Sequence, residues 1–201
     1  MKKYFFLALV LSLSISASAE IYAVDRVIDS AALELTDGRV VRLIGIDPYF
    51  GKDPRATDFV RKIVGDRAQA NVRLEFDVQK EDDDGRWLAY MYLYACEPGC
   101  QVDADVGYAF SELDDGVYLF LNETILAAGY GLPIIVQPNA KHADLFRRAH
   151  ENAKERKWGV WADPPSRLDE LLDLNGPAPK KQNGSISDYF DRGMIKIKND
   201  F

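Results

Sequence analysis

The stretch DDDGRWLAYMY, residues 82–92, decides the fold of this chain, which has 201 residues. Its three acids and its glycine are typical of a turn, and the residues from Trp87 onward are typical of an aromatic-rich strand. Before the turn, apolar and polar residues alternate from Val72 to Val78, which predicts another strand. The sequence therefore predicts two consecutive strands joined by an acidic loop at residues 79–85.

Three further strands are predicted toward the N-terminus. The pair Asp37-Gly38, which is typical of a hairpin turn, separates the last two of them. A helix follows them, because Asp53 suits an N-cap, Pro54 suits the first helical position and Gly65 suits the end of a helix. The three predicted strands are Ile21–Ile28, Ala32–Thr36 and Val40–Ile46.

The second half of the chain is predicted to be largely helical after an interruption. Residues 95–117 contain both cysteines and little helical periodicity, so we interpret them as an inserted hairpin or loop. Helices are predicted at 122–128 and 144–157, with a short one at 167–174. Five strands, an intervening helix and C-terminal helices indicate an α+β fold. The expected architecture is a five-stranded Greek-key barrel of the oligonucleotide/oligosaccharide-binding (OB) type with about three helices.

The N-terminus has the pattern of a secretory signal. Lys2 and Lys3 precede an apolar run and a small-residue ending at Ala19, and the run is shorter than the roughly 20 residues of a spanning helix. We therefore expect a signal peptide at 1–19 rather than a membrane anchor, export to the periplasm or medium, and no transmembrane segment in the mature chain. The expected divisions after it are 20–162 for the barrel domain and 163–201 for a C-terminal helix, a linker and a tail.

Composition excludes two classes of protein. With 47% hydrophobic residues the chain can bury a core, so it is not globally disordered. A net charge of −7 also argues against a protein that captures nucleic acid by bulk charge. Any phosphate site must therefore be a local cluster of basic residues.

The chain has two cysteines, Cys96 and Cys100, which flank the tripeptide Glu-Pro-Gly. A Pro-Gly turn and an oxidising compartment favour a disulfide between them. A metal site is a weaker alternative, because two thiolates need two more ligands and His142 and His150 lie far along the chain. Two free thiols are the remaining alternative.

Four motifs in sequence order resemble the staphylococcal nuclease (thermonuclease) family. The strands around residues 27–29 and 41–47 resemble the family's opening hairpins, and residues 82–92 resemble its Asp-x-x-Gly-Arg-x-Leu-Ala-Tyr strand. Residues 122–130 resemble its next helix, and residues 149–161 resemble its last helix with a Gly-x-Trp ending. The resemblance covers roughly residues 21–161, apart from the insertion, and implies the OB-type barrel.

The resemblance also implies a chemistry, Ca²⁺-dependent hydrolysis of phosphodiesters. In that family carboxylates hold the cation, a glutamate is the proposed base and two arginines contact the phosphate. Arg42 and Arg86 match the two arginines, and Asp47 matches one calcium-binding aspartate. Asp29 matches the first acid of the family's Asp-Gly-Asp-Thr turn, and Pro48 falls where a backbone carbonyl binds the cation.

Two positions depart from the family pattern. Ala31 replaces the second acid of the turn, which is a metal ligand, and Phe50 replaces the catalytic glutamate. Loss of one catalytic group lowers the rate by about 10²–10⁴-fold, so we expect an impaired nuclease site with weakened Ca²⁺ binding. A rearranged metal site is the alternative, in which Asp29 shares a strand face with Ala31 and approaches the cation. Asp53 is better explained as a helix N-cap.

Three functions remain open on the sequence alone. The preferred one is an exported thermonuclease-like protein whose arginine pair, in one shared pocket, binds nucleic acid or a nucleotide phosphate. The second is an active phosphodiesterase with the rearranged site, and the third is a cell-envelope module that binds a protein partner. The alternating Tyr90, Tyr92 and Tyr94 suit either base stacking or ordinary barrel packing.

Overall fold

The structure is a computed structural model that describes residues 20–47, 53–65, 71–102 and 107–164. Several of the sequence predictions fall outside these ranges. They are the signal peptide, Pro48, Phe50, the short helix at 167–174, the linker and the tail.

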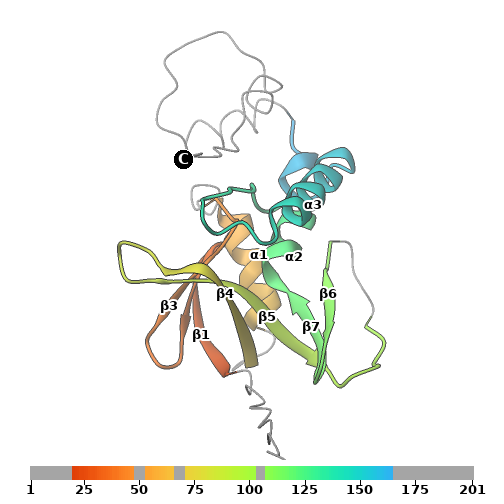
Figure 1. Ribbon diagram of the computed structural model, residues 1–201. Coiled ribbons are helices and arrows are strands. Elements are labelled where there is room, and N and C mark those ends of the chain that lie inside the picture. The colour runs from red at the N-terminus through yellow and green to blue at the C-terminus, as the bar shows by residue number, and fades with distance from the viewer. Residues whose placement is uncertain (1–19, 48–52, 66–70, 103–106, 165–201) are drawn as a thin grey trace, which may run out of the picture.

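Five strands form a closed ring, as predicted. β1 pairs antiparallel with both β2 and β4, β2 pairs with β3, and β4 pairs with β5. A parallel pairing between β3 and β5 closes the ring, which confirms the OB-type barrel (Figure 1). The strands are β1 Ile21–Asp29, β2 Ala32–Leu35, β3 Val40–Leu43, β4 Asn71–Glu81 and β5 Trp87–Cys96.

In the described part of the chain three α-helices accompany the barrel, and α3 lies beyond α2 at one end of it (Figure 1). They are α1 Pro54–Gly65, α2 Leu121–Ala127 and α3 Ala143–Glu155, followed by the short 3-10 helix η2, Gly159–Ala162. Their apolar faces supply buried residues to the core, which is why periodicity located them within two residues of their ends. No helix of the described part of the chain is long and apolar enough to cross a membrane.

The segment interpreted as an insertion contributes to a further hairpin on the edge of β5, which extends past residue 117 to Phe120. β6, Phe110–Leu113, pairs with β7, Gly116–Phe120, and β7 pairs with β5. Figure 1 shows this hairpin beside the barrel, on the side of β5 that faces away from β4. Cys96 and Cys100 form a disulfide at the end of β5, as expected for the Pro-Gly turn between them.

Tyr90 and Tyr92 of β5 are packing residues rather than an exposed stacking surface, whereas Tyr94 is half-buried and its ring packs edge-on against Tyr118. Tyr90 and Tyr92 are 1% and 8% exposed, and the ring of Tyr92 stacks on Phe120 with centroids 4.5 Å apart. Their hydroxyls donate to carboxylates of β4, Tyr90 to Asp77 at 3.1 Å and Tyr92 to Glu75 at 2.8 Å. The alternation along β5 therefore places these rings under α2 and α3, where they cannot stack on bases.

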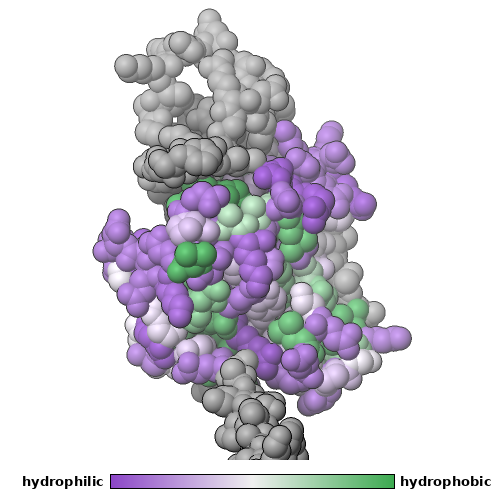
Figure 2. Space-filling view, viewed as in Figure 1, coloured by the Kyte–Doolittle hydropathy of each residue, from purple (hydrophilic) through white to green (hydrophobic). Residues whose placement is uncertain are grey.

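The outer surface is mostly polar, in keeping with the acidic composition. On the face shown in Figure 2, hydrophilic residues predominate and small apolar areas interrupt them. Among large apolar side chains in the described ranges, four stand out as exposed: Ile21, Ile28, Val78 and Val136.

A buried histidine makes the stability of this fold sensitive to acid. His150 of α3 is 5% exposed, and its ring packs edge-on against Trp161 with centroids 5.1 Å apart. Burial lowers the pKa of His150 to about 4, and the charge of Lys154 acts in the same direction. Below pH 6.5 the unfolded chain takes up a proton that the folded chain does not, so acid favours unfolding.

We therefore expect the free energy of unfolding to fall by about 3 kcal/mol between about pH 6.5 and pH 4 through this residue. Urea unfolding of the wild type and of His150→Gln, at pH 7 and pH 4.5, checks this. The acid-induced loss should be smaller in the variant than in the wild type, and the carboxylates whose pKa is lowered by folding, such as Asp77 and Asp82, account for the loss that both proteins share. An equal acid-induced loss in both proteins would contradict the assignment.

Candidate functional site

The turn between β1 and β2 is a closed, largely buried structure. β1 ends at Asp29 and β2 begins at Ala32, so Ala31 lies in the turn after Asp29 and the two do not share one face of a continuous strand. The Asp29 carboxylate accepts the backbone N–H of Ala31 at 2.7 Å, which is an Asx turn. Ala31 is 0% exposed and belongs to the core. The position that the resemblance assigns to a metal-binding acid is therefore filled by a buried methyl group.

Arg42 projects from β3 and joins two separate segments of backbone. Its guanidinium donates to the carbonyl of Ala31 and to the carbonyl of Ile46, each at 2.6 Å. Burial lowers the pKa of Arg42, and the negative charge of Asp29 opposes this shift. Since a guanidinium stays charged in proteins, these bonds hold a cation at a fixed place beside the turn.

The chain after β3 turns back toward the Arg42 side chain at Gly45, and this turn requires a glycine. Gly45 has a φ of +83°, and a Cβ at this position would overlap the ring of Phe146 in α3. The chain can therefore bend over α3 at Gly45 and present the carbonyl of Ile46 to Arg42.

Arg86 forms ion pairs with two acids of its own loop. The Asp82 carboxylate accepts the backbone N–H groups of Asp84 and Arg86 at 3.0 and 2.9 Å, and the Nε–H of Arg86 at 2.7 Å. Asp84 makes a second ion pair with Arg86 at 2.9 Å. Burial would raise the pKa of Asp82, but the hydrogen bonds from Arg86 outweigh it and hold the pKa below its usual value. The acidic loop is thus organised around the arginine rather than simply solvated.

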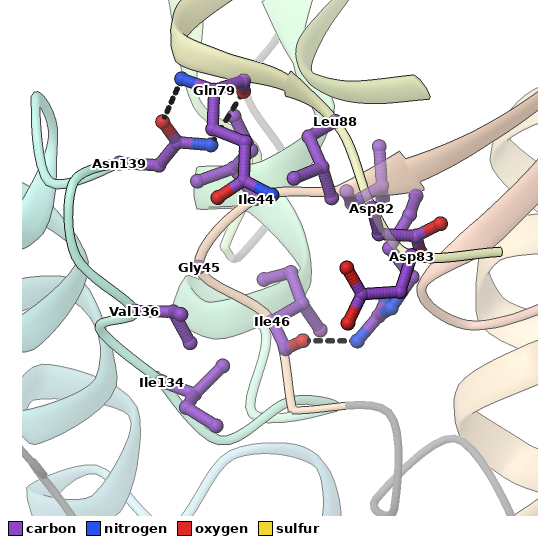
Figure 3. Close-up of a pocket in the computed structure, with 12 residues that line it drawn as sticks. Ile44, Gly45, Ile46, Gln79, Asp82, Asp83, Leu88, Ile134, Val136 and Asn139 are labelled. Carbon is purple, nitrogen blue, oxygen red and sulfur yellow. Dashed lines mark hydrogen bonds between the residues drawn. The ribbon is translucent and has the colours of Figure 1, made fainter. Parts of the chain in front are cut away.

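A pocket of about 550 Å³ lies between the end of β3, the loop before α3 and the hairpin at residues 79–88, which is called the β4–β5 arm below (Figure 3). Arg42 lines this pocket, whereas Arg86 does not, although its charge also lowers the pKa of Arg42. The two arginines are therefore electrostatic neighbours that the structure does not place side by side in one cavity. The lining residues used below are Arg42, Gln79, Asp82, Asp83, Leu88, Ile134, Val136 and Asn139, together with the backbone segment 43–46.

The walls of the pocket are held together by an asparagine that the sequence analysis missed. Asn139 accepts the backbone N–H of Gln79 at 2.8 Å and donates to the carbonyl of Gln79 at 2.7 Å, as Figure 3 shows. On the other side, Ile134 N–H donates to the carbonyl of Gly45 at 3.1 Å. The loop at 132–139 is therefore attached to both other walls. Periodicity gave no signal for it, because these contacts join residues far apart in the sequence, 60 positions in the case of Asn139 and Gln79.

Two further acids near the site, Asp47 and Asp53, differ in their contacts. Asp47 accounts for one of the negative charges that act on Arg42, and its backbone N–H donates to the carbonyl of Leu132 at 2.9 Å. Asp53 is 2% exposed and caps α1, where its carboxylate accepts the backbone N–H of Arg55 at 2.9 Å and pairs with the Arg55 guanidinium. Asp53 is thus committed to the start of a helix.

The oxygen ligands of the described residues do not by themselves fit a calcium ion. Ca²⁺ takes six to eight oxygen ligands, usually with several carboxylates. Within the described ranges, no group of three or more His, Cys, Asp or Glu side chains is placed to hold a metal. One carboxylate oxygen of Asp29 accepts the backbone N–H of Ala31. The nearby carbonyls of Ala31 and Ile46 accept hydrogen bonds from Arg42.

Comparison with known proteins agrees with the fold and the matched motifs. The Staphylococcal nuclease homologue family matches residues 41–163. A thermonuclease of Staphylococcus hyicus is 28% identical over 163 residues, which cover 74% of this chain and 79% of that protein. The family match begins within β3 and includes Arg42, Arg86 and the helices α1, α2 and α3. It covers more than half of the chain. The chain belongs to the staphylococcal nuclease homologue family.

Proposed function

We propose that this protein is an exported thermonuclease-like protein with an impaired hydrolytic site that binds a nucleotide phosphate through Arg42. One observation carries the proposal. Arg42 is fixed at the edge of a pocket by two backbone carbonyls, while the neighbouring acid position of the family is the buried Ala31. A guanidinium has five N–H donors, and among the described residues these two carbonyls use two of them, so the geometry is compatible with further bonds to phosphate oxygens.

The chemistry of hydrolysis explains why the site is expected to be slow. Attack on a phosphodiester needs a group that orients or deprotonates water and positive charge that stabilises the phosphate oxygens. Arg42 can supply charge, but Phe50 replaces the carboxylate that would activate water. Ala31 likewise supplies no carboxylate to a metal, and its surroundings are apolar core. Binding of a phosphate therefore requires fewer of the missing groups than its hydrolysis does.

A cleavage assay tests the impaired site. The purified protein is incubated with single-stranded DNA and with RNA, in Ca²⁺ and in a chelator, beside an active thermonuclease as reference. We expect a rate at least about 10³-fold below the reference, because two catalytic groups are absent. Cleavage near the reference rate that requires Ca²⁺ and disappears in Arg86→Ala would establish the rearranged-site alternative instead.

Titration with a nucleoside 3′,5′-bisphosphate tests the binding function separately. Saturable binding that is weakened in Arg42→Met supports a phosphate pocket. If the wild type shows no saturable binding, the phosphate pocket is wrong, and the alternative of a cell-envelope module that binds a protein partner gains support.

Export is the remaining part of the proposal, and the N-terminal pattern at residues 1–19 supports it. We expect the protein recovered from the periplasm or the culture medium of the producing cells to begin at Glu20. Sequencing of its N-terminus checks this. Recovery only from the cell interior, with residues 1–19 still attached, would contradict it.

A further inference from the structure

The pocket beside Arg42 has one charged end and one aliphatic wall. Arg42, Asp82 and Asp83 form the charged end. The wall consists of branched aliphatic side chains, and none of the described lining residues is aromatic. The wall residues whose side chains are not buried are Leu88, Ile134 and Val136, whereas Leu43, Ile44 and Ile46 are buried core residues behind them.

Val136 is the most exposed part of this wall. It is 60% exposed although it is a large apolar residue, and Figure 3 shows it on the loop before α3, close to Ile134. Its position is fixed, because the backbone N–H of Asn139 donates to the carbonyl of Val136 at 3.0 Å and the Asn139 side chain is tied to Gln79. An exposed valine held on a braced turn over a cavity offers apolar contact area without the entropy cost of ordering a loop.

The side-chain amides of Asn139 and Gln79, which line the pocket, form hydrogen bonds within the protein. Both groups of the Asn139 amide bind the backbone of Gln79, and the Gln79 side-chain amide donates to the carbonyl of Glu81 at 2.8 Å. Proteins recognise unpaired bases by stacking them on aromatic rings or by hydrogen bonds to their edges. The described lining supplies no ring for stacking, and both groups of the Asn139 amide are occupied.

Resting on the proposed phosphate site, we infer that this pocket binds a phosphate ester through the phosphate and a saturated aliphatic group, and that a nucleobase adds little. Arg42 recognises the phosphate, and Val136 with Ile134 contacts the carbon atoms next to it. An alkyl phosphate and the sugar-phosphate part of a nucleotide both carry this chemistry. The experiment below separates these two sources.

The test measures dissociation constants by calorimetry for four probes: inorganic phosphate, n-butyl phosphate, 2-deoxyribose 5-phosphate and 2′-deoxyadenosine 5′-phosphate. We expect n-butyl phosphate to bind about tenfold more tightly than inorganic phosphate, since burial of about two methylene groups gives that factor. The adenine nucleotide should bind within about threefold of deoxyribose phosphate, because unstacked bases add little. Tighter binding of butyl phosphate than of deoxyribose phosphate identifies the alkyl source, and the reverse identifies the sugar-phosphate source.

Variants of the exposed valine connect these results to the wall. Val136→Ser should reduce the advantage of butyl phosphate to about threefold and leave the binding of inorganic phosphate unchanged. Val136→Tyr should add a stacking surface and strengthen binding of the adenine nucleotide by about tenfold. Val78→Ser is the matched control, because Val78 is 72% exposed on β4 and is not a lining residue. It should change none of the constants.

Two results would overturn the inference, and a different one would overturn its basis. If butyl phosphate binds no better than inorganic phosphate, or if adenine improves binding tenfold in the wild type, the aliphatic wall does not select the ligand. If none of the four probes binds, the proposed phosphate site itself is wrong.

Discussion

Replacing Arg42 by methionine is expected to weaken binding of a nucleoside 3′,5′-bisphosphate by about thirtyfold, since each hydrogen bond from a charged group contributes about 1.5–3 kcal/mol. The guanidinium is the cation that the structure fixes at the pocket, through the carbonyls of Ala31 and Ile46. Arg42→Lys should recover only part of the affinity, because an ammonium group cannot bind both carbonyls and the phosphate in the same geometry. Calorimetric titration measures these changes.

The controls separate binding from folding. Arg86→Met should weaken binding by only about threefold, because Asp82 and Asp84 already neutralise this arginine and it does not line the pocket. Arg26→Met, at a side chain 63% exposed on β1, should have no effect. Circular dichroism before each titration shows that the variants are folded. Equal losses in the Arg42 and Arg86 variants would favour the shared arginine pocket that the resemblance implies.

Asn122→Ala is expected to lower the free energy of unfolding by about 3–4 kcal/mol, because a buried donor or acceptor left without a partner costs about 1–3 kcal/mol. Asn122 is 0% exposed at the start of α2. Its amide donates to the carbonyl of Ile44 at 2.8 Å and accepts the backbone N–H of Met91 at 2.9 Å. The substitution would leave both backbone groups unpaired in an apolar core.

Urea unfolding at pH 7 measures this loss. Asn152→Ala is the matched control, because Asn152 is an exposed asparagine of α3 whose side chain accepts one bond from Arg156 at 3.1 Å. It should change the free energy of unfolding by less than about 0.5 kcal/mol, as exposed substitutions usually do. A loss below about 1 kcal/mol in Asn122→Ala would show that water or a rearranged backbone satisfies the two groups.

Local sequence patterns predicted the elements of this fold well. The alternation from Val72 to Val78 and the aromatic run after Trp87 became β4 and β5, although both strands extend beyond the predicted ends. The Asp53-Pro54 start and the Gly65 end of α1 were found because capping is a local interaction. The inserted segment was harder, since β6 and β7 are defined by pairing with each other and with β5.

The candidate site was predicted less completely. The motifs located Arg42, Arg86, Asp29 and Asp47, and the departure at Ala31 was visible in the sequence. The sequence did not show which groups each arginine binds. Arg42 uses carbonyls that lie eleven residues before it and four after it, and Arg86 uses acids of its own loop. Backbone carbonyls carry no residue-type signal, so no motif could have indicated them.

The sequence by itself determined the barrel, its helices and the absence of an acid at position 31, because hydrophobic periodicity, caps and residue identity are local properties. Only the tertiary structure decided that one arginine, not two, lines the pocket, and that the pocket wall is aliphatic. Both results depend on contacts between segments far apart in the chain, such as Asn139 with Gln79 and Ile134 with Gly45. These contacts exist only after the β4–β5 arm and the loop before α3 have packed against the end of β3.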